Sequence, residues 1–238
     1  MTLNVYVDGF NLYKGALTPN DGVKWLDLKK FAQLQYPEAK LQDIFYFTAR
    51  LKNLFPGDTS NERQHTYLRA LEDSGIKIIE GFFDVRSRWE QIHGRALKEF
   101  TDPRLANPLG ATQVSLRRIW KMSEPKRPEV QVLIRREKGS DVNLASYMLK
   151  DLFNGKCDHF LVVTGDSDLI TPMKIVEEQG AKLSLLVPGR QENNSFRKLS
   201  GIFRDTKLIS IEDIQKSQFT NPYVCANGRQ IHRPKSWT

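Results

Sequence analysis

Four aspartates stand where this sequence changes from apolar to polar, and they are the side chains best placed to do chemistry. Asp8 follows the apolar run LNVYV, and Asp166 and Asp168 follow HFLVVTG. Asp141 opens an amphipathic stretch, and Asn11 accompanies Asp8. A carboxylate at the end of a core strand costs free energy unless a partner compensates for it. Either these acids cap helices or they hold a cation.

Each acid has a simple structural explanation when it is taken alone. Asp168 is placed to cap a helix that begins at Leu169, and Asp141 to cap a helix over residues 143–153. Asp8 followed by Gly9 is typical of a turn. None of these explanations requires a ligand.

Taken together, the acids favour a cation. Carboxylates gathered at one edge of a sheet repel each other, at a cost of about 4 kcal/mol for a pair about 4 Å apart at an effective dielectric constant of about 20. A divalent ion removes that cost. Ligands that are all oxygen, without His or Cys, favour Mg²⁺ or Mn²⁺ over zinc, and such an ion activates water against a phosphodiester.

Apolar runs that alternate with amphipathic segments predict the fold that positions these acids. Strands are expected at residues 3–7, 43–49, 76–81, 130–136, 159–165 and 181–188, and helices at 25–36, 61–75, 141–155 and 169–179. Such a series predicts an α/β fold with a mostly parallel sheet covered by helices on both faces. Ligands of these sheets lie outside the carboxyl ends of the strands, which is where the acids fall.

Two segments depart from the alternation. Residues 82–129 are too long for a normal connection, are rich in Arg and Lys, and contain Trp89, Phe100 and Trp120. We expect an insertion there, helical at 112–122, which either binds single-stranded nucleic acid or packs its aromatic side chains on the main domain as a lid. Residues 1–210 then form the main domain, and residues 211–238 a helix and an extended strap on it, a disordered end being the alternative.

Composition limits the class of protein. The chain has 238 residues, 39% of them hydrophobic and 27% charged, with a formal net charge of +8. These values suit one soluble α/β domain, and the positive charge is compatible with a nucleic-acid partner. No apolar run is long enough to cross a membrane, the N-terminal residues do not resemble a signal peptide, and Cys157 and Cys225 form no disulfide framework. We therefore expect a cytoplasmic protein.

Motifs of other enzyme classes are missing from the sequence. It contains no G-x-G dinucleotide fingerprint, no phosphate-binding loop and no G-x-S-x-G element, and its histidines lack metal-ligand spacing. A phosphatase of the haloacid dehalogenase type needs a second acid two residues after the first, and Phe10 occupies that position.

Three segments in order carry a family resemblance: NVYVDGFNLY, EKGSDVNLASYMLKD and FLVVTGDSDLITPMKIVEEQGAKLSLLVPG. They resemble the NYN domain, in the LabA-like branch of the PIN-like nuclease superfamily, and the tail NPYVCANGRQIHRPKSW resembles the strap of many bacterial members. The resemblance implies a Rossmann-like, PIN-like fold and a metal-dependent ribonuclease. It implies catalytic roles for Asp8, Asn11, Asp141, Asp166 and Asp168.

The expected site follows from these matches. Asp8, Asp166 and Asp168 are expected to hold Mg²⁺ or Mn²⁺, and Asp141 to complete the shell or orient the attacking water. Asn11 would position the phosphate. Substrate binding is expected from the hydroxyl residues beside the acids and from nearby cations: Thr164, Ser167, Lys138, Arg190, Arg197 and Lys198.

Three functions are open at this point. The first is hydrolysis of single-stranded RNA. The second is a regulatory module that keeps the fold and binds RNA or a partner without turnover. The third is a small-molecule enzyme that uses nicotinamide or flavin, with Arg86, Arg88 and Trp89 binding an acidic aromatic substrate. A homodimer is compatible with all three.

Overall fold

The computed structural model describes residues 1–53, 56–91, 121–123, 127–189 and 193–237. The chain divides into two compact units: residues 1–53, 58–82 and 137–238 form the first, and residues 54–57 and 83–136 form the second. All predicted acids fall in the first unit.

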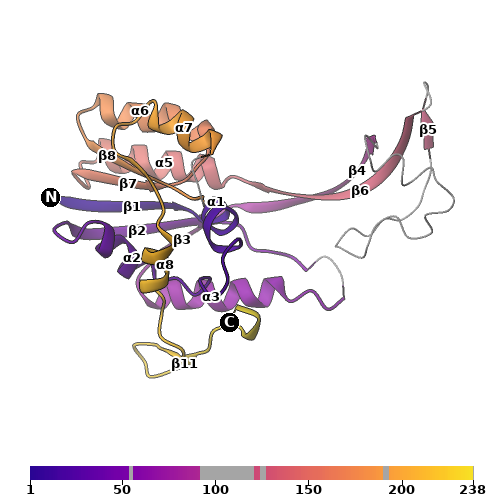
Figure 1. Cartoon of the computed structure of the whole chain (residues 1–238), viewed down its shortest axis with the longest axis horizontal. Coiled ribbons are helices and arrows are strands. Elements are labelled where there is room, and N and C mark those ends of the chain that lie inside the picture. Colours follow the sequence, from indigo (N-terminus) through magenta and orange to yellow (C-terminus); the bar gives the residue numbers. More distant parts are fainter. Residues whose placement is uncertain (54–55, 92–120, 124–126, 190–192, 238) are drawn as a thin grey trace. The chain divides into compact units, whose positions relative to one another are not determined.

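A six-stranded sheet is the centre of the first unit, with strand order β3-β2-β1-β7-β8-β9 (Figure 1). All of its neighbouring pairs are parallel. The strands are β1 (Thr2–Asp8), β2 (Lys40–Thr48), β3 (Lys77–Glu80), β7 (His159–Val163), β8 (Lys182–Val187) and β9 (Thr206–Leu208). The predicted α/β fold with a mostly parallel sheet is confirmed.

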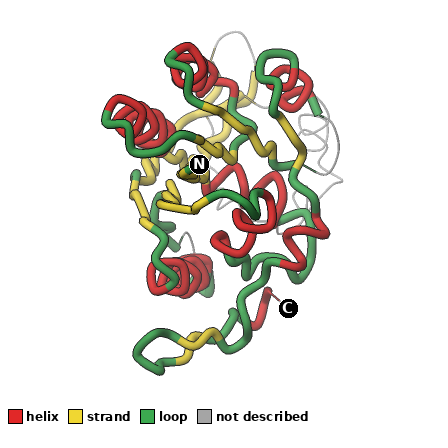
Figure 2. Tube along the Cα trace, turned by 90° about the vertical axis from the view of Figure 1, so that its left-hand side faces the viewer, coloured by secondary structure: helices red, strands yellow, loops and turns green. Residues whose placement is uncertain are grey.

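Helices cover both faces of this sheet, as the view from the side shows (Figure 2). One face packs against α5 (Ser140–Phe153), α6 (Ile170–Glu178) and α7 (Asn194–Ser200). The other face packs against α2 (Leu28–Gln35), α3 (Ser60–Asp73) and α8 (Ile211–Lys216). β1 is buried from Leu3 to Asp8 because both of its faces are covered, which explains why its sequence is almost continuously apolar.

The side chains of β1 alternate between two hydrophobic clusters. Leu3, Val5 and Val7 belong to the cluster with α2, α3 and α8. Tyr6 belongs to the cluster with α5, α6 and α7. Because side chains alternate along a strand, Asp8 follows Tyr6 on the α5 side. This register directs the first acid toward the start of α5.

The last residues of the described chain pack into the core of the first unit. After α8 come β10 (Tyr223–Val224), β11 (Gln230–Ile231) and the short helix η3 (Lys235–Trp237). The Trp237 ring is 6% exposed and lies 6.4 Å from the Trp25 ring and 5.9 Å from the Tyr67 ring, measured between centroids. The Trp25 indole nitrogen donates to the carbonyl of Thr220 at 3.1 Å.

The second unit contributes a separate three-stranded sheet with strand order β4-β6-β5. Its strands are β4 (Phe82–Gln91), β5 (Lys121–Ser123) and β6 (Arg127–Lys138). The strand predicted at residues 130–136 therefore exists but does not join the main sheet, because strand-forming residues do not specify a pairing partner. Residues 112–120 of the predicted helix lie outside the described residues, and 121–122 belong to β5.

Among the helices in the described ranges, none has the length and apolar character that crossing a bilayer requires.

Candidate active site

Asp8 is the buried centre of the candidate site, with 5% of its surface exposed. It ends β1 and caps the short helix α1 (Gly9–Leu12), since its Oδ1 accepts the backbone N–H of Asn11 at 2.9 Å. The Asn11 side-chain oxygen accepts the N–H of Gly165 at 2.9 Å. The two predicted motifs that contain Asp8 and Asp166 are thus joined directly.

A second chain of hydrogen bonds runs from Asp8 through the GDSD segment. The Thr164 hydroxyl donates to Asp8 Oδ2 at 3.0 Å and accepts the N–H of Asp166 at 3.0 Å. Asp166 Oδ1 accepts the N–H of Asp168 at 2.9 Å and so caps the short helix η2 (Ser167–Leu169). Thr164 is completely buried, whereas Asp168 is exposed. The solvent exposure of these acids therefore increases from Asp8 through Asp166 to Asp168.

Asp141 reaches the same region from α5. Its helix begins after Gly139, whose φ of +89° is a left-handed conformation that glycine adopts without strain. Gly139 is the N-cap and makes no side-chain capping bond, so Asp141 lies in the first turn and is not the cap. Asp168 likewise lies in the first turn of η2, which Asp166 caps. The simple capping explanation therefore fails for Asp141 and Asp168.

Glu137 is a further acid of the cluster that sequence reasoning missed. The Ser140 hydroxyl donates to its carboxylate across the turn at Gly139. Burial raises the pKa of Glu137, and the charge of Asp141 raises it further. Its position in the EKGSD segment, three residues before Ser140 and four before Asp141, could have indicated in the sequence that it lies near the other acids.

The acids influence one another through their charges. Burial raises the pKa of Asp8 to about 7, and the charges of Asp141 and Glu137 add to the rise, while the hydrogen bonds from Asn11 and Thr164 oppose it. The pKa of Asp141 is also raised, first by its partial removal from water and then by the charges of Asp166 and Asp168. Five carboxyl groups are therefore close enough to act as one electrostatic unit, which we call the acid cluster: Asp8, Glu137, Asp141, Asp166 and Asp168.

Tyr46 and Gly9 pack tightly beside Asp8. A Cβ on Gly9 would lie 2.5 Å from the Tyr46 ring and 2.8 Å from the carbonyl oxygen of Phe47, so no larger residue fits there. Burial raises the pKa of Tyr46, and the charges of Glu137 and Asp8 raise it further. Tyr46 thus supplies a neutral phenol next to the acid cluster.

The cluster is not arranged as a closed metal cage. Within the part of the chain that the structure describes, no three His, Cys, Asp or Glu side chains form a group ready to hold an ion. The donor set is nevertheless all oxygen, and burial, with a smaller contribution from the charges of Asp141 and Glu137, raises the pKa of its most buried member, Asp8. This chemistry fits a hard divalent cation such as Mg²⁺ or Mn²⁺.

The predicted substrate-binding residues fall at different distances from the cluster. Ser167 belongs to the GDSD segment itself and Thr164 directly precedes it, while Lys138 lies at the end of β6 before α5. Arg197 and Lys198 are exposed on α7, which contacts η2. Arg190 lies outside the described residues.

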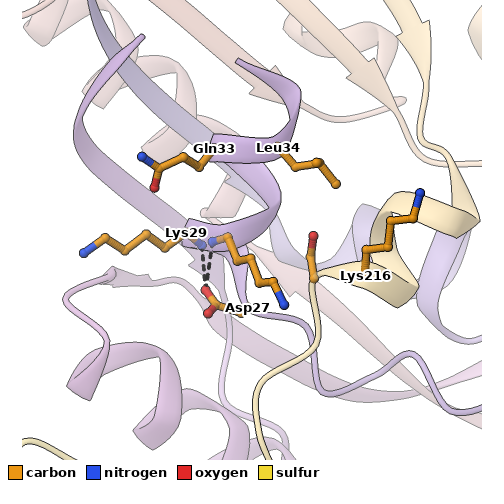
Figure 3. Close-up of a pocket in the computed structure, with 7 residues that line it drawn as sticks. Asp27, Lys29, Gln33, Leu34 and Lys216 are labelled. Carbon is orange, nitrogen blue, oxygen red and sulfur yellow. Dashed lines mark hydrogen bonds between the residues drawn. The ribbon is translucent and has the colours of Figure 1, made fainter. Parts of the chain in front are cut away.

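A cavity of about 510 Å³ lies elsewhere, between α2 and α8 (Figure 3). Three lysines and one aspartate are among the residues that line it. None of its lining residues belongs to the acid cluster; they are Asp27, Lys29, Lys30, Gln33, Leu34, Lys216 and Ser217.

Comparisons with known proteins agree with the fold and add a second chemistry. The family model described as NYN domain matches residues 2–205. A protein of Pseudomonas putida (strain DSM 28022 / S16), described as 6-hydroxy-3-succinoylpyridine 3-monooxygenase HspA, is 28% identical over 256 residues. That alignment covers 98% of this chain and 74% of the relative. No solved structure matches.

Proposed function

The chain belongs to the NYN domain family, within the PIN-like nuclease superfamily, and from this premise we propose that it is a metal-dependent ribonuclease. The observation that carries the proposal is the state of Asp8. It is a buried carboxyl group with a pKa raised to about 7, and four other carboxyl groups form one electrostatic unit with it. Such a perturbed group among charge partners is typical of a catalytic site. Membership of the LabA-like branch stays a prediction.

Asp8, Asp166 and Asp168 would hold Mg²⁺ or Mn²⁺ through their oxygens. When bound, the ion would lower the pKa of a water molecule and offset the charge that develops on the phosphodiester. Removing the mutual repulsion of the carboxylates would also favour ionisation of Asp8.

The chain's own residues orient the reactants. The Asn11 side-chain oxygen is occupied by the N–H of Gly165, so its amide nitrogen is the part that can donate to a phosphate oxygen. Asp141 makes no capping bond, and its raised pKa suits a group that accepts a proton from the attacking water. Thr164 keeps Asp8 in one rotamer through its hydrogen bond.

The exposed surroundings of the cluster support a nucleic-acid substrate. Arg197 and Lys198 are cations on the helix next to η2, and the whole chain carries a net charge of +8. Contacts of this kind bind phosphates and give a salt-dependent affinity. We propose single-stranded RNA as the substrate and the cytoplasm as the place of action. A homodimer is a further prediction, which light scattering tests.

The test is cleavage of a labelled single-stranded RNA by purified protein in Mn²⁺, in Mg²⁺ and in EDTA. Asp8→Asn, Asp141→Asn and Asp168→Asn proteins are compared with Asp21→Asn, which changes an exposed aspartate in a turn outside the cluster. We expect metal-dependent cleavage by the wild type and the control, and loss in the three cluster variants. Equal cleavage by all proteins would identify a contaminant. Binding without cleavage would favour the regulatory module.

A second candidate function is oxidation of a small aromatic acid, and the similarity to the Pseudomonas monooxygenase is what favours it. Three of the residues that line the cavity are lysines, Lys29, Lys30 and Lys216, and their positive charge would attract an acidic substrate. The test incubates the protein with 6-hydroxy-3-succinoylpyridine, oxygen and reduced nicotinamide, with and without added flavin. Substrate-dependent consumption of the nicotinamide and formation of a hydroxylated product would establish this function, and their absence would exclude it for that substrate.

A further inference from the structure

Phe10 is an exposed aromatic side chain directly beside the acid cluster. It lies two residues after Asp8, in α1 at the carboxyl end of β1 (Figure 1). Its side chain is 46% exposed, whereas Gly9 and Leu12 of the same helix are buried. A ring of this size left in water gives up the free energy that burial would provide. What distinguishes Phe10 from other exposed aromatic side chains, such as Phe153, is its place next to Asp8 and Asn11.

The backbone that carries Phe10 is fixed from several directions. Asp8 accepts the N–H of Asn11, and the Asn11 side chain accepts the N–H of Gly165. On the other side, Gly9 packs against Tyr46 and the backbone of Phe47. The backbone of Phe10 is consequently held at a constant place relative to the acids, which limits the positions that its ring can take.

A cation accompanies the ring. The ammonium nitrogen of Lys14 lies 5.7 Å from the centroid of Phe10, and the Lys14 side chain is exposed. Residues four positions apart share one side of a helix, so both groups face the same solvent region. An exposed aromatic ring with a positive charge over one of its faces offers the two kinds of group that bind the two parts of a nucleotide, which are a planar base and a phosphate.

We propose that Phe10 and Lys14 form the nucleotide-binding part of the site, where an unpaired base stacks on the Phe10 ring and the Lys14 ammonium contacts the adjacent phosphate. This inference rests on the nuclease function proposed above and specifies its substrate as a strand with an unstacked base beside the cleaved bond. Stacking tolerates every base, because each has a flat aromatic face. A duplex must first release a base from its stack, so it is the poorer substrate.

The first test measures binding without cleavage. A single-stranded RNA that contains 2-aminopurine is titrated in EDTA with wild type, Phe10→Ala, Phe10→Trp and Phe153→Ala. Phe153 is the matched control: it is 71% exposed, and it ends α5 at the opposite end from Asp141. We expect wild type, Phe10→Trp and the control to quench the fluorescence, and Phe10→Ala to bind about 5- to 150-fold more weakly. Lys14→Gln is expected to reduce the salt slope of binding by about one.

The second test measures cleavage of the same RNA and of a version with one abasic position. Phe10→Ala is expected to lower kcat/KM on the intact strand by about 5- to 150-fold, and to match wild type on the strand whose missing base is the stacked one. Equal losses on both strands would overturn the proposal, because Phe10 would then only support α1. Quenching that does not depend on Phe10 would overturn it as well.

The two tests separate this inference from the nuclease proposal. If no RNA is cut but quenching requires Phe10, the nuclease function fails and the base-stacking surface stands. If RNA is cut in a metal-dependent way and neither quenching nor kcat/KM responds to Phe10→Ala, the nuclease stands and the surface is excluded.

Discussion

The Thr164 hydroxyl donates to Asp8 Oδ2 at 3.0 Å while its oxygen accepts the N–H of Asp166 at 3.0 Å. Thr164 follows β7 and Asp8 ends β1, and these strands are parallel neighbours with Val7 opposite Val163. One buried hydroxyl thus connects the most enclosed acid of the cluster with the backbone of the GDSD segment. Several expectations can be derived from this arrangement and from the charges around it.

Replacing Thr164 by Val should raise the pKa of Asp8, because the lost hydrogen bond favours the ionised form. The buried carboxylate and the N–H of Asp166 would both lose a partner, at a cost of about 1–3 kcal/mol in the free energy of unfolding near neutral pH. Urea unfolding measures the stability, and carboxyl ¹³C NMR measures the pKa. Thr164→Ser keeps the hydroxyl and should stay close to wild type; a Val variant as stable as wild type would contradict the expectation.

Replacing Glu137 by Gln should lower the pKa of Asp8 in the metal-free protein. The reason is that the negative charge of Glu137 contributes to the raised pKa of Asp8. Carboxyl titration by NMR gives the value. Glu178→Gln, on the exposed end of α6, is the matched control and should leave the pKa of Asp8 unchanged. An unchanged pKa of Asp8 in Glu137→Gln would place Glu137 outside the cluster.

The contribution of Asp8 to the stability of the metal-free protein should fall as the pH rises from about 4 to about 7, opposite in sign to the contribution of His159 described below. The pKa of Asp8 is about 7 in the folded protein and close to 3.8 when it is unfolded, so the folded state binds more protons across this window. Asp8→Asn removes this effect. Between about pH 4 and about pH 7, the free energy of unfolding of the variant should therefore rise by about 4 kcal/mol relative to that of wild type. Mn²⁺ at about 100 times its dissociation constant should raise the free energy of unfolding of wild type by about 2.7 kcal/mol. It should not raise that of Asp8→Asn. Chemical unfolding of both proteins in EDTA and in Mn²⁺ measures these differences. Equal pH profiles of wild type and Asp8→Asn in EDTA would contradict the prediction.

Replacing Gly9 by Ala should destabilise the protein by about 1–3 kcal/mol, because the added methyl group overlaps Tyr46 and the backbone of Phe47. Since α1 would have to move, the position of Asn11 would change and RNA cleavage should fall more than the stability alone explains. Thermal unfolding and cleavage rates are measured together. An unchanged melting temperature would mean that α1 packs less closely on β2 than the structure indicates.

His159 should make the protein sensitive to acid. The Ser184 hydroxyl donates to Asp205, so His159 Nε2, 2.7 Å from the Ser184 oxygen, must donate to it. Nδ1 is buried and has no partner among the described residues. Burial, and then the charge of Lys182, lowers the pKa of His159 to about 4.

The folded state therefore resists protonation of this ring, and stability present above about pH 6.5 should be lost as the pH falls toward about 4. Over that pH range, the free energy of unfolding of wild type should fall by about 3 kcal/mol relative to that of His159→Gln. The exposed His65 offers the control His65→Gln. Parallel pH profiles for wild type and His159→Gln would show that folding does not change the pKa of His159.

The sequence alone was sufficient for the main strands and for four of the acids. β1, β7 and β8 are buried on both faces, so their apolar runs, and the acids at the ends of β1 and β7, were visible without a structure. β9 was missed because its three residues, Thr206–Leu208, are too few for a periodic pattern. The strand at 130–136 was assigned to the wrong sheet because pairing is decided by tertiary contacts.

The pKa shifts of the acids and the membership of Glu137 in the cluster could be found only from the structure. Glu137 resembles any surface glutamate in the sequence until the turn at Gly139 brings it beside Ser140 and Asp141. The raised pKa of Asp8 depends on burial and on neighbours from α5, more than a hundred residues away in the chain. The capping explanations for Asp141 and Asp168 were also excluded only by the observed helix starts.

The packing of Trp237 between Trp25 and Tyr67 has a consequence for synthesis on the ribosome. The cluster beneath β1 includes Trp25 from the beginning of the chain and Ile231 and Trp237 from its last residues. The opposite cluster, with α5, α6 and α7, is complete at Phe203. Since translation adds about 5–20 residues per second, the acid-bearing side of the sheet can assemble first, while the other side waits for residues 219–237 to leave the exit tunnel. A nascent chain halted before that segment would present Trp25 to chaperones.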